Sequence, residues 1–286
     1  MTDAINRRLQ PIDLAISPCP NDTFIFHHLS RNGAELLGAP VRLEFADVEE
    51  LNRRAIQERR HAVTKLSFYA MSQLGDHYQM LGNGGALGRG CGPLLITNQK
   101  GPVEPQDIRR VLIPGRYTTA NLLTHLFFAD LGLSPDEIQS IEFEAVRYEQ
   151  ILPALREGRA DFGVIIHEER FTFERAGLFA VRDLGAWWED TTGLPIPLGC
   201  IAARKDVIAG GLSAETIEAA IRSSLAHAYA HPEAGREFIK THAQALEDEV
   251  IAAHIDLYVN DFSRDLGEDG RRAVTELFRR AALAGI

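Results

Sequence analysis

The sequence predicts an α/β protein that folds as two lobes. Short apolar runs alternate with helix-like segments over residues 12–74 and again over residues 111–166, a pattern typical of a sheet with mostly parallel strands. After residue 204 the composition changes, and helical patterns follow one another without strands between them. A chain of 286 residues with ordinary hydrophobic content can bury two moderate cores.

The order of these elements suggests how the chain divides between the lobes. We expect a larger lobe from residues 1–97 and 200–286, and a smaller lobe from residues 98–199. The chain then crosses between the lobes twice, near residues 97–103 and 198–204. Two crossings would form a hinge. Ligands favour such clefts between domains, and closure of the cleft would exclude water.

Composition and charge narrow the classes of partner. The formal net charge of −10 and the absence of a long Lys/Arg run argue against nucleic acid, whereas a small anionic ligand remains possible if its charge is met locally. Cys19, Cys91 and Cys200 are far apart, so we expect neither a disulfide framework nor a metal site. No apolar export segment or membrane span is expected, which suits a reducing cytoplasm.

The loop that follows the first strand is the first candidate ligand site. Residues 16–26 read ISPCPNDTFIF, a strand end followed by a stiff turn and a helix start. Pro18 and Pro20 fix φ, and open α/β sheets bind ligands at the carboxyl ends of their strands. A tight turn that only positions the helix explains the loop equally well. The polar residue types that cap helices follow the prolines: Asn21, Asp22 and Thr23.

The remainder of the first lobe reads as alternating strands and helices. Strands are expected at residues 41–45 and 62–66, and helices at 24–37, 48–58 and 67–74, the last with Ser67 at its start.

A glycine-rich stretch then precedes a buried-looking strand. Residues 81–96 read LGNGGALGRGCGPLLI, and glycine is used where the backbone needs positive φ or close approach. The stretch fails the dinucleotide fingerprint, because Leu87 stands at the third glycine position and a strand follows instead of a helix. We interpret it as a loop near the site that includes Gly84, Gly85 and Ala86, although a flexible hairpin fits the composition as well.

A second strand, loop and helix unit begins at residues 111–113. Pro114 and Gly115 make the turn, and Thr118 and Thr119 stand where the helix over 120–131 starts. Backbone N–H groups and hydroxyls that converge at a helix N-terminus can bind an anion. Either threonine could instead be a simple N-cap.

His167 is the candidate for proton transfer. It directly follows residues 160–166, an apolar run typical of a strand buried on both faces, and α/β enzymes place reacting groups at such strand ends. Histidine is the side chain best matched to proton transfer near neutral pH. A structural histidine held by Glu168 or Glu169 is the alternative.

The other expected elements complete the chain. Trp187 and Trp188 stand beside a turn rich in Pro and Gly, where one could line a pocket and either could anchor a core. The remaining strands are expected at residues 141–146 and 201–203, and the remaining helices at residues 148–157, 213–231, 233–243, 247–259 and 270–284.

Motifs along most of the chain resemble 1,4-dihydroxy-6-naphthoate synthase, the family that acts in the futalosine route to menaquinone. The motifs are SPCPNDTF at 17–24, DVEELNRRA at 47–55, VTKLSFYA at 63–70, GGALGRGCGPLL at 84–95, IHE at 166–168, WWEDTTGLPIPLG at 187–199 and HIDLYVNDFS at 254–263.

The resemblance implies a type II periplasmic-binding-protein-like fold, with a mixed sheet flanked by helices in each lobe. It implies a lyase that cleaves cyclic dehypoxanthine futalosine and needs no metal or organic cofactor. The base falls on His167 and the carboxylate-binding threonines on Thr118 and Thr119. The opposite wall and further pocket candidates would be Ser17, Asn21, Asp22, Ser67, Gly84, Gly85 and Ala86.

Two alternatives stay open at this point. Chorismate dehydratase of the same pathway shares the implied fold, but the IHE element and the GGALGRGCGP run favour the synthase. A solute-binding protein would need no base, and the missing export signal argues against it.

Cys19, between two prolines at a helix start, looks like a nucleophile, but the implied elimination needs a base and no covalent intermediate.

Overall fold

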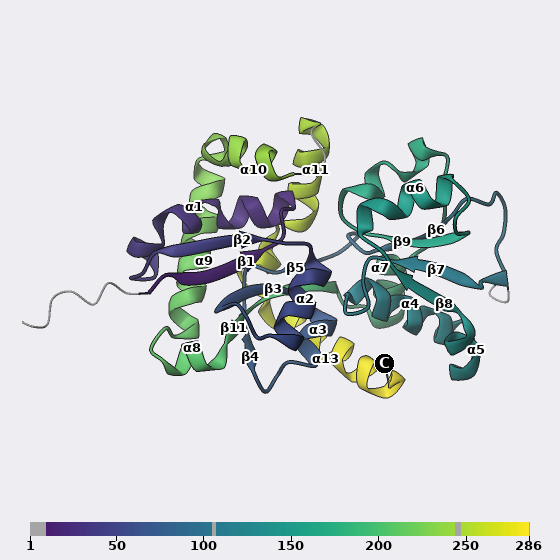
Figure 1. Cartoon of the computed structure of the whole chain (residues 1–286), viewed down its shortest axis with the longest axis horizontal. Helices are drawn as coiled ribbons and strands as arrows, with labels where there is room; N and C mark the ends of the chain where they lie inside the picture. The colour runs from purple at the N-terminus through teal and green to yellow at the C-terminus, as the bar shows by residue number, and fades with distance from the viewer. Residues whose placement is uncertain (1–9, 105–106, 244–246, 286) are drawn as a thin grey trace, which may run out of the picture.

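The computed structural model describes residues 10–104, 107–243 and 247–285. In that part of the chain the strands form two separate sheets, each with helices packed against it. Figure 1 shows the two lobes side by side. The C-terminal helix α13 (Gly267–Ala284) contacts α3 and β11 in the first lobe and α4 in the second. The expected two-lobed α/β fold is therefore confirmed.

The first sheet combines parallel and antiparallel strands. Its order is β2 (Val41–Phe45), β1 (Ile12–Ile16), β3 (Val63–Ser67), β11 (Ile196–Arg204) and β4 (Tyr78–Met80), with β5 (Ala86–Gly88) also paired to β11. β1 runs parallel to β2 and β3, whereas β11 runs antiparallel to its neighbours. The central strand β3 is buried along its whole length. A charged side chain on β3 therefore needs a partner inside the protein.

Helices cover both faces of the first sheet. On one face an apolar core joins β1 and β11 to α1 (Pro20–Leu36), α9 (Ala214–Ala230), α10 (Arg236–His242) and α11 (Asp248–Tyr258). The other face packs on α2 (Val48–Gln57), α3 (Phe68–Ser72) and α13. The short helices α8 (Lys205–Ala209), η5 (Pro232–Gly235) and α12 (Asp261–Arg264) complete the lobe.

The second sheet is also mixed. Its order is β10 (Phe179–Asp183), β6 (Leu94–Thr97), β9 (Phe162–Ile165), β7 (Arg110–Ile113) and β8 (Glu142–Ala145). β7 is parallel to β8 and β9, and β6 is antiparallel to β9 and β10. Around it lie α4 (Thr119–Asp130), α5 (Pro135–Ser140), η2 (Tyr148–Gln150), α6 (Ile151–Arg156), η3 (His167–Phe171), η4 (Phe173–Ala176) and α7 (Leu184–Thr192).

The strand pairing moves both crossings from their expected places. Residues 94–97, expected in the larger lobe, form β6 of the second sheet, and residues 196–199, expected in the smaller lobe, belong to β11 of the first. The chain crosses at residues 89–93 and 193–195. The reason is long-range pairing, since Leu94 pairs with Ile165, a partner that no local pattern reveals.

Several elements differ from the expected ones. The first helix begins at Pro20, with Cys19 as its N-cap and no side-chain cap, because proline at the first helical position needs no N–H partner. Asn21, Asp22 and Thr23 therefore lie inside the first turn and do not cap the helix. Residues 184–192, for which no element was expected, form α7 with both tryptophans buried. The sequence patterns also missed β4, α5, β10 and α12.

The cores of the two lobes meet. One apolar cluster includes Leu66 and Phe68 from the first lobe with Val111 and Phe128 from the second, and Trp188 lies in the same cluster.

No helix in the described ranges is long and apolar enough to span a bilayer.

Candidate functional site

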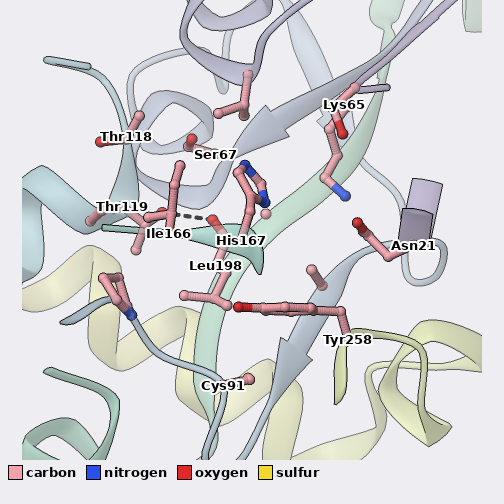
Figure 2. A pocket seen from close by; sticks show the side chains of 16 residues that line it. Asn21, Lys65, Ser67, Cys91, Thr118, Thr119, Ile166, His167, Leu198 and Tyr258 are labelled. Atoms are coloured by element: carbon pink, nitrogen blue, oxygen red, sulfur yellow. Dashed lines mark hydrogen bonds between the residues drawn. The ribbon is translucent and has the colours of Figure 1, made fainter. Parts of the chain in front are cut away.

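A pocket lies between the two lobes and draws its walls from both. It encloses about 610 Å³ of space including its open mouth, and apolar surface predominates in its lining. Figure 2 shows the side chains that line it: Ser17, Asn21, Val48, Lys65, Ser67, Ala86, Cys91, Pro93, Thr118, Thr119, Ala120, Ile166, His167, Leu198, Gly199 and Tyr258.

His167 projects into this pocket from the end of β9, as the strand-end argument predicted. Its backbone is left-handed, with φ of 57°, a conformation that costs energy in a residue other than glycine and is concentrated at functional sites. Burial lowers its pKa, and the nearby carboxylates of Glu168, Asp47 and Asp22 act in the opposite direction. The imidazole is therefore mainly neutral near pH 7 and able to accept a proton.

Thr118 and Thr119 line the pocket at the start of α4, but their hydroxyls are already used. The Thr118 hydroxyl donates to Gly115 O (2.7 Å) and accepts from Asn121 N (3.2 Å), so Thr118 is the N-cap. The Thr119 hydroxyl donates to Leu198 O (2.8 Å), drawn as a dashed line in Figure 2, and accepts from Tyr69 N (3.3 Å). What remains for an anion at this helix start is backbone N–H groups, which α-helices leave unpaired in their first turn.

Ser17 and Asn21 reach the pocket, whereas Asp22 lies behind the wall. The Asp22 carboxylate is fully buried and accepts from Ser17 N (3.1 Å), Ser17 Oγ (2.7 Å), Asn21 Nδ2 (2.9 Å) and Lys65 Nζ (2.6 Å). Four donors saturate a carboxylate. The expectation that Asp22 contacts the substrate is therefore corrected: Asp22 holds other wall residues in place.

The remaining predicted residues divide in the same way. Ser67 and Ala86 line the pocket. Gly84 does not, because it packs on Ile201 and Ile221 in the core. Gly85 is also outside the lining, and a Cβ added there would lie 2.7 Å from Gly199 O on the neighbouring strand. Close packing, not ligand contact, accounts for these two glycines.

Sequence reasoning missed Lys65 and Tyr258. Lys65 is the one charged residue in the apolar run 62–70, and a lysine in a fully buried strand is rare enough to signal a site. Tyr258 reaches the pocket from the end of α11, a long-range placement without a local signal. Cys91 also lines the pocket, but burial raises the pKa of its thiol to about 12. Cys19 is outside the lining, and burial raises its pKa also, which disfavours a nucleophile.

A buried polar group lies next to His167. The ring of His254 stacks with that of His167 at 6.0 Å between centroids, and its Nε2 lies 3.0 Å from Asn21 Oδ1. Because Asn21 Nδ2 donates to Asp22, the His254 Nε2 is the donor in this pair. Glu168 is close to His254 and accepts from the Tyr148 hydroxyl (3.2 Å).

Across the described residues, no three His, Cys, Asp or Glu side chains are placed to hold a metal ion.

The fold and pocket define a class of protein, two α/β lobes around a ligand cleft as in periplasmic binding proteins. The aliphatic sulphonate binding protein of Escherichia coli has this architecture with a TM-score of 0.64, 11% identity, and 96% of this chain and 87% of that chain covered. A protein from Archaeoglobus fulgidus is more similar, with a TM-score of 0.83, 29% identity, and 96% and 98% of the two chains covered.

Sequence relatives define the family. The model of the menaquinone biosynthesis family matches residues 12–283, and the chain belongs to this family. A relative from Thermus thermophilus named 1,4-dihydroxy-6-naphtoate synthase is 48% identical, with 97% of this chain and 96% of the relative covered. A relative of the same name from Streptomyces coelicolor is 41% identical, with 96% and 94% covered. The resemblance drawn from the motifs is confirmed.

Proposed function

We propose that this protein is a 1,4-dihydroxy-6-naphthoate synthase that cleaves cyclic dehypoxanthine futalosine in menaquinone biosynthesis. The observation that carries the proposal is His167, a mainly neutral imidazole held on a left-handed backbone in the interlobe pocket. Two relatives that match over nearly the full length carry the corresponding name. A lyase of this kind needs a base in a mostly apolar site, and the pocket supplies both.

The first chemical step is proton abstraction by His167 from the carbon next to the ring carbonyl. The resulting enolate then expels the sugar-derived fragment, and carbon–carbon cleavage makes the ring aromatic, which drives the reaction. The side chains of Leu198, Ile166 and Tyr258 give the ring an apolar environment. Exclusion of water by these groups strengthens the electrostatic interactions within the site.

The substrate carboxylate fits the N-terminus of α4. The Thr118 to Ala120 segment lines the pocket, and the positive end of the helix dipole favours an anion there. The protein has a net charge of −10, so a local site of this kind is what attracts a small anionic substrate. We place the reaction in the cytoplasm, without nucleic-acid or membrane partners.

Incubation with cyclic dehypoxanthine futalosine tests this function directly. The native protein should release a naphthoate chromophore, and its absence would refute the function. His167→Asn should lower turnover by about 10² to 10⁴-fold while substrate affinity stays nearly native, because positioned proton transfer is worth that much. Asparagine tolerates the left-handed backbone, so the fold is preserved.

The matched control is His77→Asn. His77 is outside the pocket lining, and its hydrogen bonds with the described residues are made by its backbone, so this variant should turn over at the native rate. Native turnover by His167→Asn would remove the base assignment and leave the function standing.

A further inference from the structure

Lys65 brings a full positive charge to the wall of the pocket. It is the one Lys or Arg among the described residues of the lining, and its side chain is 6% exposed. It stands in the middle of β3, the buried central strand of the first sheet. Burying an ammonium is costly unless it is paired, so a lysine at this position needs an acidic partner and indicates a functional role.

Asp22 is the partner, but it accepts only one of the hydrogen bonds that the ammonium can donate. The Nζ to Oδ1 distance is 2.6 Å, and Asp22 is itself saturated by three other donors from Ser17 and Asn21. An ammonium has three N–H donors, of which the hydrogen bonds of the described residues use one. Figure 2 shows the side chains of Lys65, Asn21 and His167 in the same part of the pocket, and the Asn21 amide is paired with Asp22 and His254. Donors of Lys65 are therefore available to a ligand opposite His167.

Gly199 makes room for this lysine. A Cβ at position 199 would lie 2.9 Å from Lys65 Cε and 3.1 Å from Leu66 O. Gly199 belongs to β11, which pairs with β3, and it lines the pocket as well. The stem of Lys65 thus crosses the neighbouring strand at a position where a larger residue would push it away. The two strands are built to direct the ammonium into the pocket.

We propose that Lys65 is a second catalytic residue, whose ammonium stabilises the oxygen that becomes negative when His167 removes the proton. The proposal rests on the proposed function. In this step the C–H electron pair becomes the C=C bond of an enolate, the carbonyl π pair moves onto oxygen, and the proton stays on His167. Lys65 keeps its own protons throughout. Asp22 holds the ammonium, and Asn21 Nδ2 donates to the same carboxylate oxygen.

A substitution that keeps the length of Lys65 but removes its charge tests the role. Lys65→Met should lower kcat by about 10² to 10³-fold, the cost of losing a donor aimed at developing charge, while the substrate Kd changes much less. A raised Kd with native kcat would overturn the proposal, because Lys65 would then anchor the substrate carboxylate. Lys100→Met, at an exposed position outside the pocket, is the matched control with native kinetics.

A double variant separates a loss of catalysis from a loss of the fold. Lys65→Met alone leaves Asp22 buried without its cation, whereas Lys65→Met with Asp22→Asn removes both charges, and a buried pair replaced as a unit is often tolerated. The double variant should fold, bind substrate and show the same loss in kcat. Native kcat in the folded double variant would refute the role of Lys65.

An optical titration of a bound ligand tests the effect of the Lys65 charge without turnover. The probe is 6-hydroxy-2-naphthoate, whose ionised hydroxyl absorbs at longer wavelength. Native protein should lower the pKa of the bound hydroxyl by about 1 to 3, the effect of a cation nearby. The Lys65→Met variant should not, and an equal lowering in both would overturn the proposal. If the native protein lowers this pKa yet leaves cyclic dehypoxanthine futalosine intact, the proposed function fails while the oxyanion site stands.

Discussion

One buried histidine, His254, and one half-buried histidine, His125, make the stability of this protein depend on pH. Burial lowers the pKa of His254 well below its ordinary value near 6.5 and that of His125 to about 4. Below pH 6.5 the unfolded chain binds a proton at each of these positions, whereas the folded protein does not. These neutral histidines therefore make their full contribution to the free energy of unfolding above pH 6.5. The contribution is lost as the pH falls from 6.5 towards the pKa of each histidine in the folded protein.

His125→Phe tests this dependence at a site away from the pocket. His125 lies on α4 and stacks on Phe143 at 4.1 Å between centroids, a contact that phenylalanine can replace. The variant should remove a slope of up to about 1.4 kcal/mol per pH unit between pH 6.5 and 4. Urea unfolding at pH 5, 6 and 7 measures it. Parallel curves for the native protein and the variant would contradict the assignment.

Residues whose chemistry shows in the local pattern could be predicted as part of the site. His167 and Thr118 stand at a strand end and a helix start, and both line the pocket. The family resemblance placed Asp22 on the pocket wall, and its buried partner has no visible signal in the sequence. Its partner Lys65 is 43 residues away. Pairing across that separation depends on the sheet order, which a single sequence does not reveal.

At the scale of elements, α4 links the anion site to helix stability. The Thr118 hydroxyl caps the helix by accepting from Asn121 N, and it donates to Gly115 O in the preceding loop. Thr118→Ala should cost about 1 kcal/mol of stability, typical of a lost N-cap, and raise KM because the first-turn N–H groups lose their fixed orientation.

Thr118→Ser keeps the capping hydroxyl and is the matched control. Serine ranks at least as high as threonine at this position, so stability and KM should stay close to native. Thermal unfolding and steady-state kinetics on the two variants separate the effects. A native KM in a destabilised Thr118→Ala would show that the helix start does not bind the substrate.

Elements formed by local patterns were predicted well, and those formed by pairing were not. The helix expected at residues 213–231 is α9 at Ala214–Ala230, because Ser213 caps it and its apolar stripe is regular. The strand expected at residues 201–203 extends from Ile196 to Arg204. Pro197 and Gly199 concealed its first half, and the sheet accommodates them with a register shift between the two residues.

For the whole molecule, the two-lobed architecture was predictable from alternation and length, but the joint between the lobes was not. The joint combines the shared apolar cluster with polar contacts from α2 to the loop before α4. Glu49 accepts from the backbone N–H of Tyr117 (3.0 Å), and Asn52 Nδ2 donates to Tyr117 O (3.3 Å). Burial raises the pKa of Glu49 to about 7. This contact holds the second lobe against the first at one side of the pocket.

Gly115→Ala should open the molecule at this contact. Gly115 has a φ of 155°, and a Cβ there would lie 2.3 Å from Glu49 Cδ, so the Glu49 side chain must turn away and give up its hydrogen bond to Tyr117 N. The second lobe then loses one polar contact to the first beside the pocket, and substrate affinity should fall by about tenfold, equivalent to about 1.4 kcal/mol. Small-angle X-ray scattering should show a larger radius of gyration than that of the native protein.

Gly101→Ala is the control for backbone strain alone. Gly101 has a φ of 120° but no atom within 4 Å of an added Cβ, so this variant carries the conformational cost without a collision between lobes. It should bind substrate and scatter like the native protein. If both alanine variants weaken binding equally, strain and not the Glu49 contact is responsible. Native scattering by Gly115→Ala would show that this contact does not hold the lobes together.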